Sequence, residues 1–173
     1  MDIAYRTSAA APWRRALPIV LSAILVLTLA VPAAAGFKKI KLSVHERQGG
    51  HTIERHVGKS DQELIDRLAK QKKISAASTF PGRSAAERAV TATLNANEKK
   101  VRVWMKTAGR GERLVIQGKG KGRGISRKHF NQAMKAQDRE AALQAAVGDR
   151  SRTRVVLEAN GKGGFHVLTA YPE

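Results

Sequence analysis

The segment His45–Ser60 holds the side chains in this sequence that are best suited to acid–base chemistry. It contains three of the chain's five histidines. His51 and Arg55 are four residues apart, so on a short helix they would lie on one face. A histidine titrates near neutral pH and can accept a proton, whereas an arginine stays charged. A base beside a fixed cation, in a strongly basic chain, indicates chemistry on a phosphate group.

A pair of hydroxyl groups near the other end of the chain offers a second half for such a site. The run Phe165–Tyr171 follows a turn at Asn160–Gly164 and reads as a closing strand. Thr169 and Tyr171 alternate, so they project from one face and could hold a phosphate or transfer a proton. The alternative is an edge strand that contains Thr and Tyr for their β-propensity. The same alternation predicts that His166 faces away from Thr169.

A run of alternating glycine and cation, GKGKGRG, spans Gly118–Gly124. We expect a flexible basic loop whose Lys119, Lys121 and Arg123 bind the phosphates of the substrate. A solvated loop without this role is the alternative. The run is not a P-loop, because the Walker spacing and the terminal Ser or Thr are missing.

Elements that would position these groups can be assigned from capping signals and periodicity. Ser60–Glu63 and Ser84–Glu87 both match a capping box, so we expect helices that end near Lys72 and Ala96, with a loop over residues 75–83 between them. Alternation in Val101–Lys106 predicts a strand. Further strands are expected at Arg113–Gln117, Arg152–Ala159 and Phe165–Tyr171, with an inserted helical segment near residues 127–150. Helices followed by antiparallel hairpins indicate the α+β class.

The amino end resembles an export signal. Arg14 and Arg15 precede an apolar run over residues 16–31, and Ala33 and Ala35 have the spacing of a signal-peptidase site. We expect residues 1–35 to be a signal peptide cleaved by signal peptidase, or alternatively an uncleaved inner-membrane anchor. Either way the protein is exported and periplasmic or secreted. Residues 36–44 would form a basic arm, and residues 45–173 a single domain.

The net charge and the amino-acid composition limit the classes of partner and of chemistry that the protein can have. The formal net charge is +18 at pH 7, which calls for an anionic partner: nucleic acid, anionic lipid or an acidic inhibitor protein. The chain has no cysteine, which excludes disulfides, thiol catalysis and zinc–thiolate sites.

Several motifs together resemble a known family. They are His45-Glu46, the run Gly50–Gly58, the run Ala77–Phe80, the Trp104 segment, Val155–Leu157 and Thr169–Pro172. In this order they resemble the bacterial ribonuclease A-like toxin domains at the carboxyl ends of contact-dependent growth-inhibition proteins and other polymorphic toxins. Two features differ from that family: the helical stretch near residues 127–150 is longer, and the domain directly follows its own signal peptide.

The resemblance implies a ribonuclease A-like α+β fold without disulfides. It implies a monomeric, metal-independent RNA transphosphorylase without a cofactor, which leaves a 2′,3′-cyclic phosphate, and an acidic immunity protein as partner. Carried over onto this sequence, its catalytic residues are His45, Arg55, Thr169 and Tyr171, with His51 as the competing histidine. His56 is expected to support the fold. The alternative function is a non-catalytic basic protein that binds nucleic acid or the anionic cell envelope.

Overall fold

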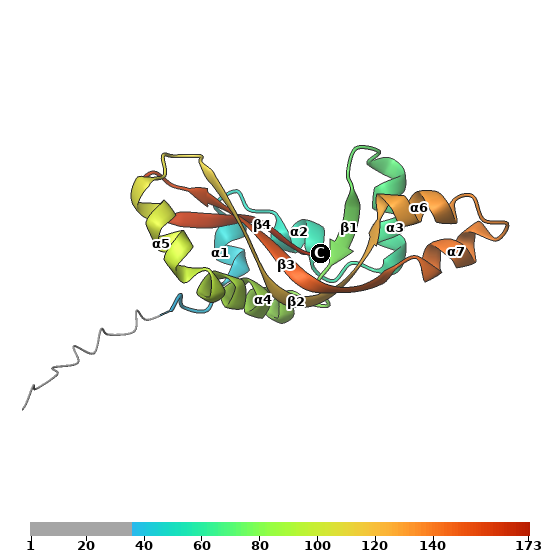
Figure 1. The fold of residues 1–173 in the computed structure, drawn as a ribbon, viewed down its shortest axis with the longest axis horizontal. Coiled ribbons are helices and arrows are strands. Elements are labelled where there is room, and N and C mark those ends of the chain that lie inside the picture. The colour runs from blue at the N-terminus through green and yellow to red at the C-terminus, as the bar shows by residue number, and fades with distance from the viewer. Residues whose placement is uncertain (1–35) are drawn as a thin grey trace, which may run out of the picture. The chain divides into compact units, whose positions relative to one another are not determined.

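The structure is a computed structural model, and it describes residues 36–173. Helices precede most of the sheet, which confirms the predicted α+β class (Figure 1). The helices are α1 (Leu42–Glu46), α2 (Thr52–His56), α3 (Asp61–Lys70), α4 (Arg83–Ala96), α5 (Glu98–Thr107), α6 (Arg127–Ala133) and α7 (Arg139–Ala145), and the strands are β1 (Ala76–Thr79), β2 (Arg113–Ser126), β3 (Gly148–Ala159) and β4 (Phe165–Pro172). The predicted signal peptide or anchor falls in residues 1–35, outside the described residues. Within residues 36–173 no helix is long and apolar enough to cross a membrane.

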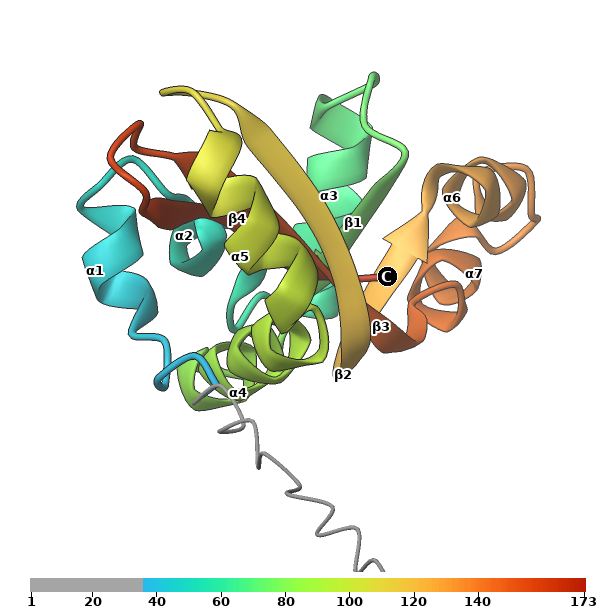
Figure 2. The same ribbon diagram turned by 60° about the vertical axis from the view of Figure 1, so that its left-hand side comes forward.

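One antiparallel sheet runs in the order β1-β2-β3-β4. Strand β2 is long enough to pair with β3 over most of its length and with β1 at its carboxyl end, where Arg123–Ser126 face Ala76–Thr79. Figure 2 shows β2 curving past α4 and α5 toward α6. The short β1, in the segment predicted as a loop over residues 75–83, is therefore a sheet edge.

The two predicted capping boxes have different outcomes. At α3, Ser60 accepts a hydrogen bond from the Glu63 amide at 3.2 Å, and the Ser60 amide donates to the Glu63 carboxylate at 2.8 Å, which confirms the first box. At α4 the N-cap is Gly82, which has no side chain to cap the helix. The Glu87 carboxylate instead accepts a hydrogen bond from the Leu42 amide at 3.0 Å, so it ties α1 to α4.

The predicted strand over Val101–Lys106 is wrong, because these residues belong to α5. Val101, Trp104 and Met105 pack into the core, and their spacing of three and four residues is helical. An ion pair one turn apart, between Glu98 and Arg102 at 2.7 Å, adds to the helix. Over so short a segment, apolar residues at every second position are compatible with either a strand or a helix.

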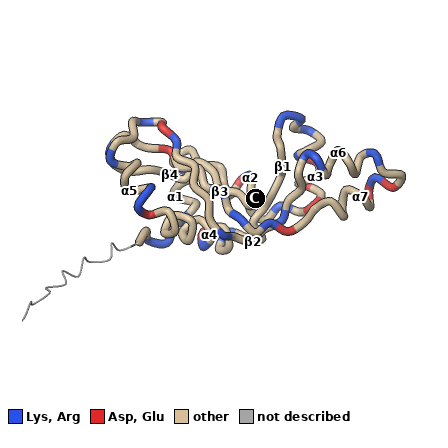
Figure 3. The backbone as a smooth tube through the Cα atoms, in the orientation of Figure 1, with Lys and Arg blue, Asp and Glu red and all other residues tan. Residues whose placement is uncertain are grey.

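The predicted flexible loop over Gly118–Gly124 is also wrong, because these residues continue β2. A side chain at Gly118 would collide with Thr93 of α4, and one at Gly120 with Thr153 of β3. The glycines therefore allow close packing, while Lys119 is exposed. Lys and Arg positions are spread over much of the described chain (Figure 3).

Residues 36–44 lie against the domain through their apolar side chains, while the lysines are exposed, so the expected basic arm is docked and not free. Leu42 is fully buried, and Phe37 lies against Phe165 with ring centroids 5.8 Å apart. The amides of Phe37 and Ile40 donate to Asn95 and Thr91 of α4. This segment therefore belongs to the compact domain.

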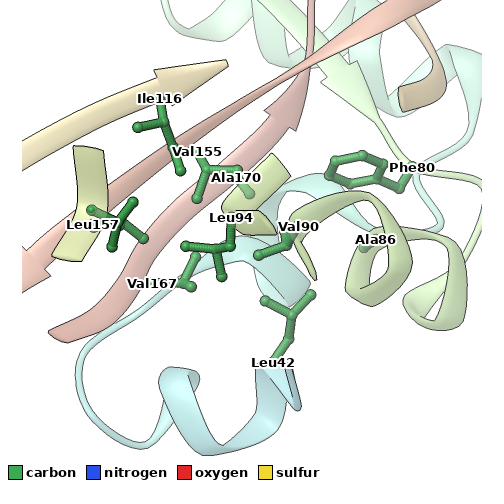
Figure 4. Close-up of a cluster of buried hydrophobic side chains, with 11 residues drawn as sticks. Leu42, Phe80, Ala86, Val90, Leu94, Ile116, Val155, Leu157, Val167 and Ala170 are labelled. Atoms are coloured by element: carbon green, nitrogen blue, oxygen red, sulfur yellow. The ribbon is translucent and has the colours of Figure 1, made fainter. Parts of the chain in front are cut away.

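Two hydrophobic clusters hold the domain together. The larger lies between α4 and the sheet (Figure 4) and contains Leu42, Phe80, Ala86, Val90, Leu94, Val101, Ile116, Val155, Leu157, Val167 and Ala170. The smaller joins α3, β1 and the predicted helical insertion, which contains α6 and α7, through Leu64, Ile65, Leu68, Ala77, Ile125, Phe130 and Val147.

Candidate active site

A β-bulge in β4 decides which side chains face the site. Val156 pairs with Thr169 and Leu157 with Val167, so Leu168 is an extra residue in β4. The bulge lets Val167 and Ala170 both enter the core although they are three residues apart. Thr169 shares a face with Tyr171, as predicted. Because of the bulge it also shares that face with His166, so the prediction that His166 faces the other way is wrong.

The outer edge of β4 is held by the first residue of α2 and the residue before it. The His51 amide donates to the Leu168 carbonyl at 2.9 Å, and the Ala170 amide donates to the Thr52 hydroxyl at 2.9 Å. Gly50 allows this approach, because a Cβ there would lie 2.5 Å from the Val167 carbonyl oxygen. The structure thus joins the histidine segment to the closing strand, as the sequence predicted.

A cleft of about 590 Å³ opens where α2, α3 and β1 meet the ends of β3 and β4. Its lining residues are His51, His56, Arg67, Lys73, Ile74, Ser75, Ala76, Ser78, Ser126, Arg150, Arg154, Thr169, Tyr171, Pro172 and Glu173. Three of the predicted catalytic residues, His51, Thr169 and Tyr171, therefore meet in one cleft. The carboxyl end of β4, labelled C in Figure 1, lies beside α2 and β1.

His45 and Arg55, the leading predicted pair, do not line this cleft. The Nδ1 atom of His45 accepts a hydrogen bond from the Val167 amide at 3.2 Å, so its lone pair is occupied. Burial and the nearby His166 lower the pKa of His45. Arg55 is exposed and lines a separate groove between α2 and α3. The structure therefore gives His45 a role in holding β4 instead of a place beside the hydroxyl pair.

His56 is the histidine with the geometry of a base. Its Nδ1 lies 3.0 Å from the Ser78 carbonyl oxygen, which can only accept, so Nδ1 carries the proton and Nε2 keeps its lone pair. Burial, together with the positive charge of Arg67, lowers the pKa of His56 to about 4. The ring stacks on Tyr171 with centroids 5.1 Å apart. The sequence pattern assigned His56 to the fold, because nothing local shows that its ring reaches the closing strand.

Arg67 is the cation that the sequence reading missed. It is half-buried on α3, lines the cleft, and donates to the Arg55 carbonyl at 3.0 Å. No carboxylate in residues 36–173 forms an ion pair with it. Burial and the charge of Arg55 lower the pKa of Arg67. A half-buried cation without a counter-ion favours an anion in the cleft.

Thr169 and Tyr171, the predicted hydroxyl pair, are both partly buried where they line the cleft. The Thr169 hydroxyl is buried and has no hydrogen-bond partner among the described residues. Burial raises the pKa of Tyr171, although the charge of Arg154 opposes the shift. Arg154 lies opposite Tyr171 on β3 and is held by Glu173, with 2.8 Å between Nε and the carboxylate. Tyr171 therefore keeps its proton at neutral pH.

The predicted substrate-binding residues Lys119, Lys121 and Arg123 are exposed and do not line the cleft. Both Nε and Nη2 of Arg123 donate to Asp61, at 3.1 and 2.6 Å. This part of the prediction is therefore not supported by the geometry. The described residues also contain no group of three His, Cys, Asp or Glu side chains placed to share a metal ion.

The fold agrees with what comparisons with known proteins find. Residues 50–172 match the model of a family described as the bacterial CdiA-CT RNAse A domain, and the chain belongs to this family. It is thus a ribonuclease A-like domain of the contact-dependent growth-inhibition toxin class, which confirms the resemblance seen in the sequence. The matched range contains His51, His56 and Arg67 and begins after His45.

A solved structure supports the fold assignment. The chain is similar to one in the crystal structure of the CdiA-CT/CdiI complex from Y. kristensenii 33638, with a TM-score of 0.55 and 25% sequence identity. The match covers 72% of this chain and 99% of that chain. A search of curated proteins finds no match.

Proposed function

We propose that this protein is an endoribonuclease that cuts RNA by attack of the 2′-hydroxyl on the adjacent phosphorus. The observation that carries the proposal is one cleft that brings together a neutral histidine with a free Nε2 and an arginine without a counter-ion. Two hydroxyl groups, of Thr169 and Tyr171, complete the set. Membership of a ribonuclease A-like toxin family supports the same activity.

In the first half of the reaction His56 acts as the general base. Its Nε2 takes the proton of the 2′-hydroxyl, and the oxygen forms a bond to phosphorus. Negative charge grows on the non-bridging oxygens, where Arg67 and the Thr169 hydroxyl donate hydrogen bonds. An arginine stays charged throughout, so it stabilises the transition state without titrating.

In the second half the bond from phosphorus to the 5′-oxygen breaks. The Tyr171 phenol gives its proton to the leaving oxygen, or alternatively orients the phosphate while water supplies that proton. The products are a 2′,3′-cyclic phosphate and a free 5′-hydroxyl. Loss of the His56 proton to solvent and regain of a proton by Tyr171 restore the starting state. His51, at the rim of the same cleft, is the competing base.

RNA cleavage by the purified protein tests the proposal. All proposed steps use side chains, so we expect cleavage in the presence of EDTA, with a 2′,3′-cyclic phosphate end detected by mass spectrometry. DNA of the same sequence lacks the nucleophile and should remain intact. If RNA is bound but never cut, the non-catalytic nucleic-acid-binding alternative is favoured instead.

We also propose that the activity is toxic and is neutralised by a partner protein. The related Y. kristensenii chain is found in a complex with CdiI. A chain with a net charge of +18 would suit an acidic immunity protein that covers the cleft. Because residues 1–35 have the pattern of a signal peptide, we also propose that the domain is exported. Growth of cells that express the domain with and without the neighbouring gene tests the toxicity.

A further inference from the structure

We propose that Arg150 and Lys73 form a second phosphate-binding site in the cleft. It takes a phosphate of the same RNA strand, next to the one that is cut. The inference rests on the proposed ribonuclease function and adds that the preferred substrate is an oligonucleotide with at least two phosphates.

The first observation is unbalanced charge in the part of the cleft away from Tyr171. Arg150 and Lys73 both line the cleft, and neither forms an ion pair with a carboxylate of residues 36–173. By contrast, Arg123 and Arg154 of the sheet are paired, with Asp61 and Glu173 respectively. The residues that line the cleft therefore include four cationic side chains and a single acidic side chain, an excess that suits a polyanion.

The second observation is the distance between Arg150 and Arg154 along β3. Arg150 and Arg154 are four residues apart on one strand, so they share a face and their Cα atoms lie about 13 Å apart. The Arg154 guanidinium is fixed by Glu173, and Nη2 of Arg150 donates to the Gly124 carbonyl at 2.9 Å. With both groups anchored, they do not converge on one phosphate. Because Tyr171 pairs with Arg154, Arg150 lies farther along β3 than the phosphate that is cut, where it can bind another phosphate of the same strand.

The third observation is that Arg150 is positioned by its surroundings. It lies against β2 at Gly124, where an added Cβ would be 3.1 Å from the Arg150 Nε. Lys73 is exposed on the loop between α3 and β1 and reaches the cleft from the other wall. An arginine held in place and an exposed lysine can together hold a phosphate and still adapt to the path of the RNA strand. The cleft volume of about 590 Å³ exceeds what a single phosphate needs.

Substrate length gives a direct test. With the purified protein, kcat/KM is measured on a dinucleoside monophosphate, which has one phosphate, and on an RNA hexanucleotide that contains the same cut. We expect Arg150→Gln to lower kcat/KM on the hexanucleotide about tenfold and to leave the dinucleotide unchanged. Arg152→Gln is the matched control, because Arg152 is exposed on the same strand but does not line the cleft. It should change both values less than about twofold.

A binding measurement separates this inference from the ribonuclease proposal. A DNA hexanucleotide binds without being cut, so its salt dependence can be followed even if the protein cleaves nothing. Losing one phosphate contact should reduce the slope of log K against log salt by about 0.7 in Arg150→Gln, and Lys73→Gln should act in the same direction. Arg150→Lys should keep the slope, and its melting temperature shows whether the fold is retained.

Two results would overturn the second site. One is an equal loss on both substrates in Arg150→Gln, which would place Arg150 at the cut phosphate. The other is a slope of log K against log salt that is the same for Arg150→Gln as for the wild type or for Arg152→Gln.

Discussion

The imidazole of His56 and the phenol of Tyr171 stack with ring centroids 5.1 Å apart and an interplanar angle of 29°. They belong to α2 and to the last strand of the sheet, and both line the cleft. Burial lowers the pKa of the imidazole and raises that of the phenol. At neutral pH one ring is therefore a neutral proton acceptor and the other a proton donor, which is the pairing that RNA transphosphorylation needs.

The histidine roles are separated by comparing two variants. His56→Gln removes the proposed base while its amide can still donate to Ser78, and we expect kcat on RNA to fall by roughly 10² to 10⁴. His45→Gln removes a ring that accepts from Val167 outside the cleft and should keep kcat within about tenfold of the wild type. Initial rates and melting temperatures are measured for both. If His45→Gln is folded but inactive while His56→Gln is active, His45 and not His56 is the general base. If only His51→Gln loses activity, His51 is the general base.

Tyr171→Phe tests proton donation to the leaving group. The variant keeps the ring that stacks on His56 and loses only the hydroxyl. We expect kcat on RNA to fall by about 10². On a nucleoside 3′-phosphate ester with a nitrophenolate leaving group, which departs without a proton, the rate should stay close to that of the wild type. Equal losses on the two substrates would show that the phenol orients the phosphate and donates no proton.

Two threonines with buried hydroxyl groups offer a matched comparison. The hydroxyls of Thr169 and Thr153 are both buried without a hydrogen-bond partner among the described residues, but only Thr169 lines the cleft. Replacing either by Val removes an unsatisfied polar group, so we expect unfolding free energies to rise by about 1 kcal/mol or to stay unchanged. Only Thr169→Val should lower kcat/KM, by about tenfold. Comparable activity losses in both variants would mean that the hydroxyl of Thr169 has no special role.

The pKa of His56 predicts how stability depends on pH. Its folded pKa is about 4, below the ordinary value of 6.5, so between these values the unfolded chain binds a proton that the folded chain does not. Stability should therefore fall as the pH drops from 6.5 to 4, by on the order of 3 kcal/mol from this residue. Urea unfolding at pH 7, 5.5 and 4 measures the slope. His56→Gln should flatten it, leaving a smaller slope of the same sign from His45 and His51, whose pKa values are also lowered. An unchanged slope would refute the buried neutral state of His56.

Local signals in the sequence were sufficient where the interaction itself is local. The capping box at Ser60 formed because both partners lie within one helical turn. The same pattern at Ser84 did not form a capping box, because the Glu87 carboxylate accepts a hydrogen bond from the Leu42 amide, which is distant in the sequence. Likewise, Val101–Lys106 satisfied both periodicities, and packing of Trp104 and Met105 against the core selected the helix.

The sequence by itself determined the α+β class, the family, the joining of a histidine segment to the closing strand, and the shared face of Thr169 and Tyr171. These follow from residue types and short-range spacing, which are present in the chain before it folds. Only the tertiary structure decided which histidine and which arginine face that pair. The bulge at Leu168 and the packing of α2 and α3 around the cleft select His56 and Arg67 over His45 and Arg55. The direction in which a side chain points depends on contacts between elements distant in sequence, and no local pattern records them.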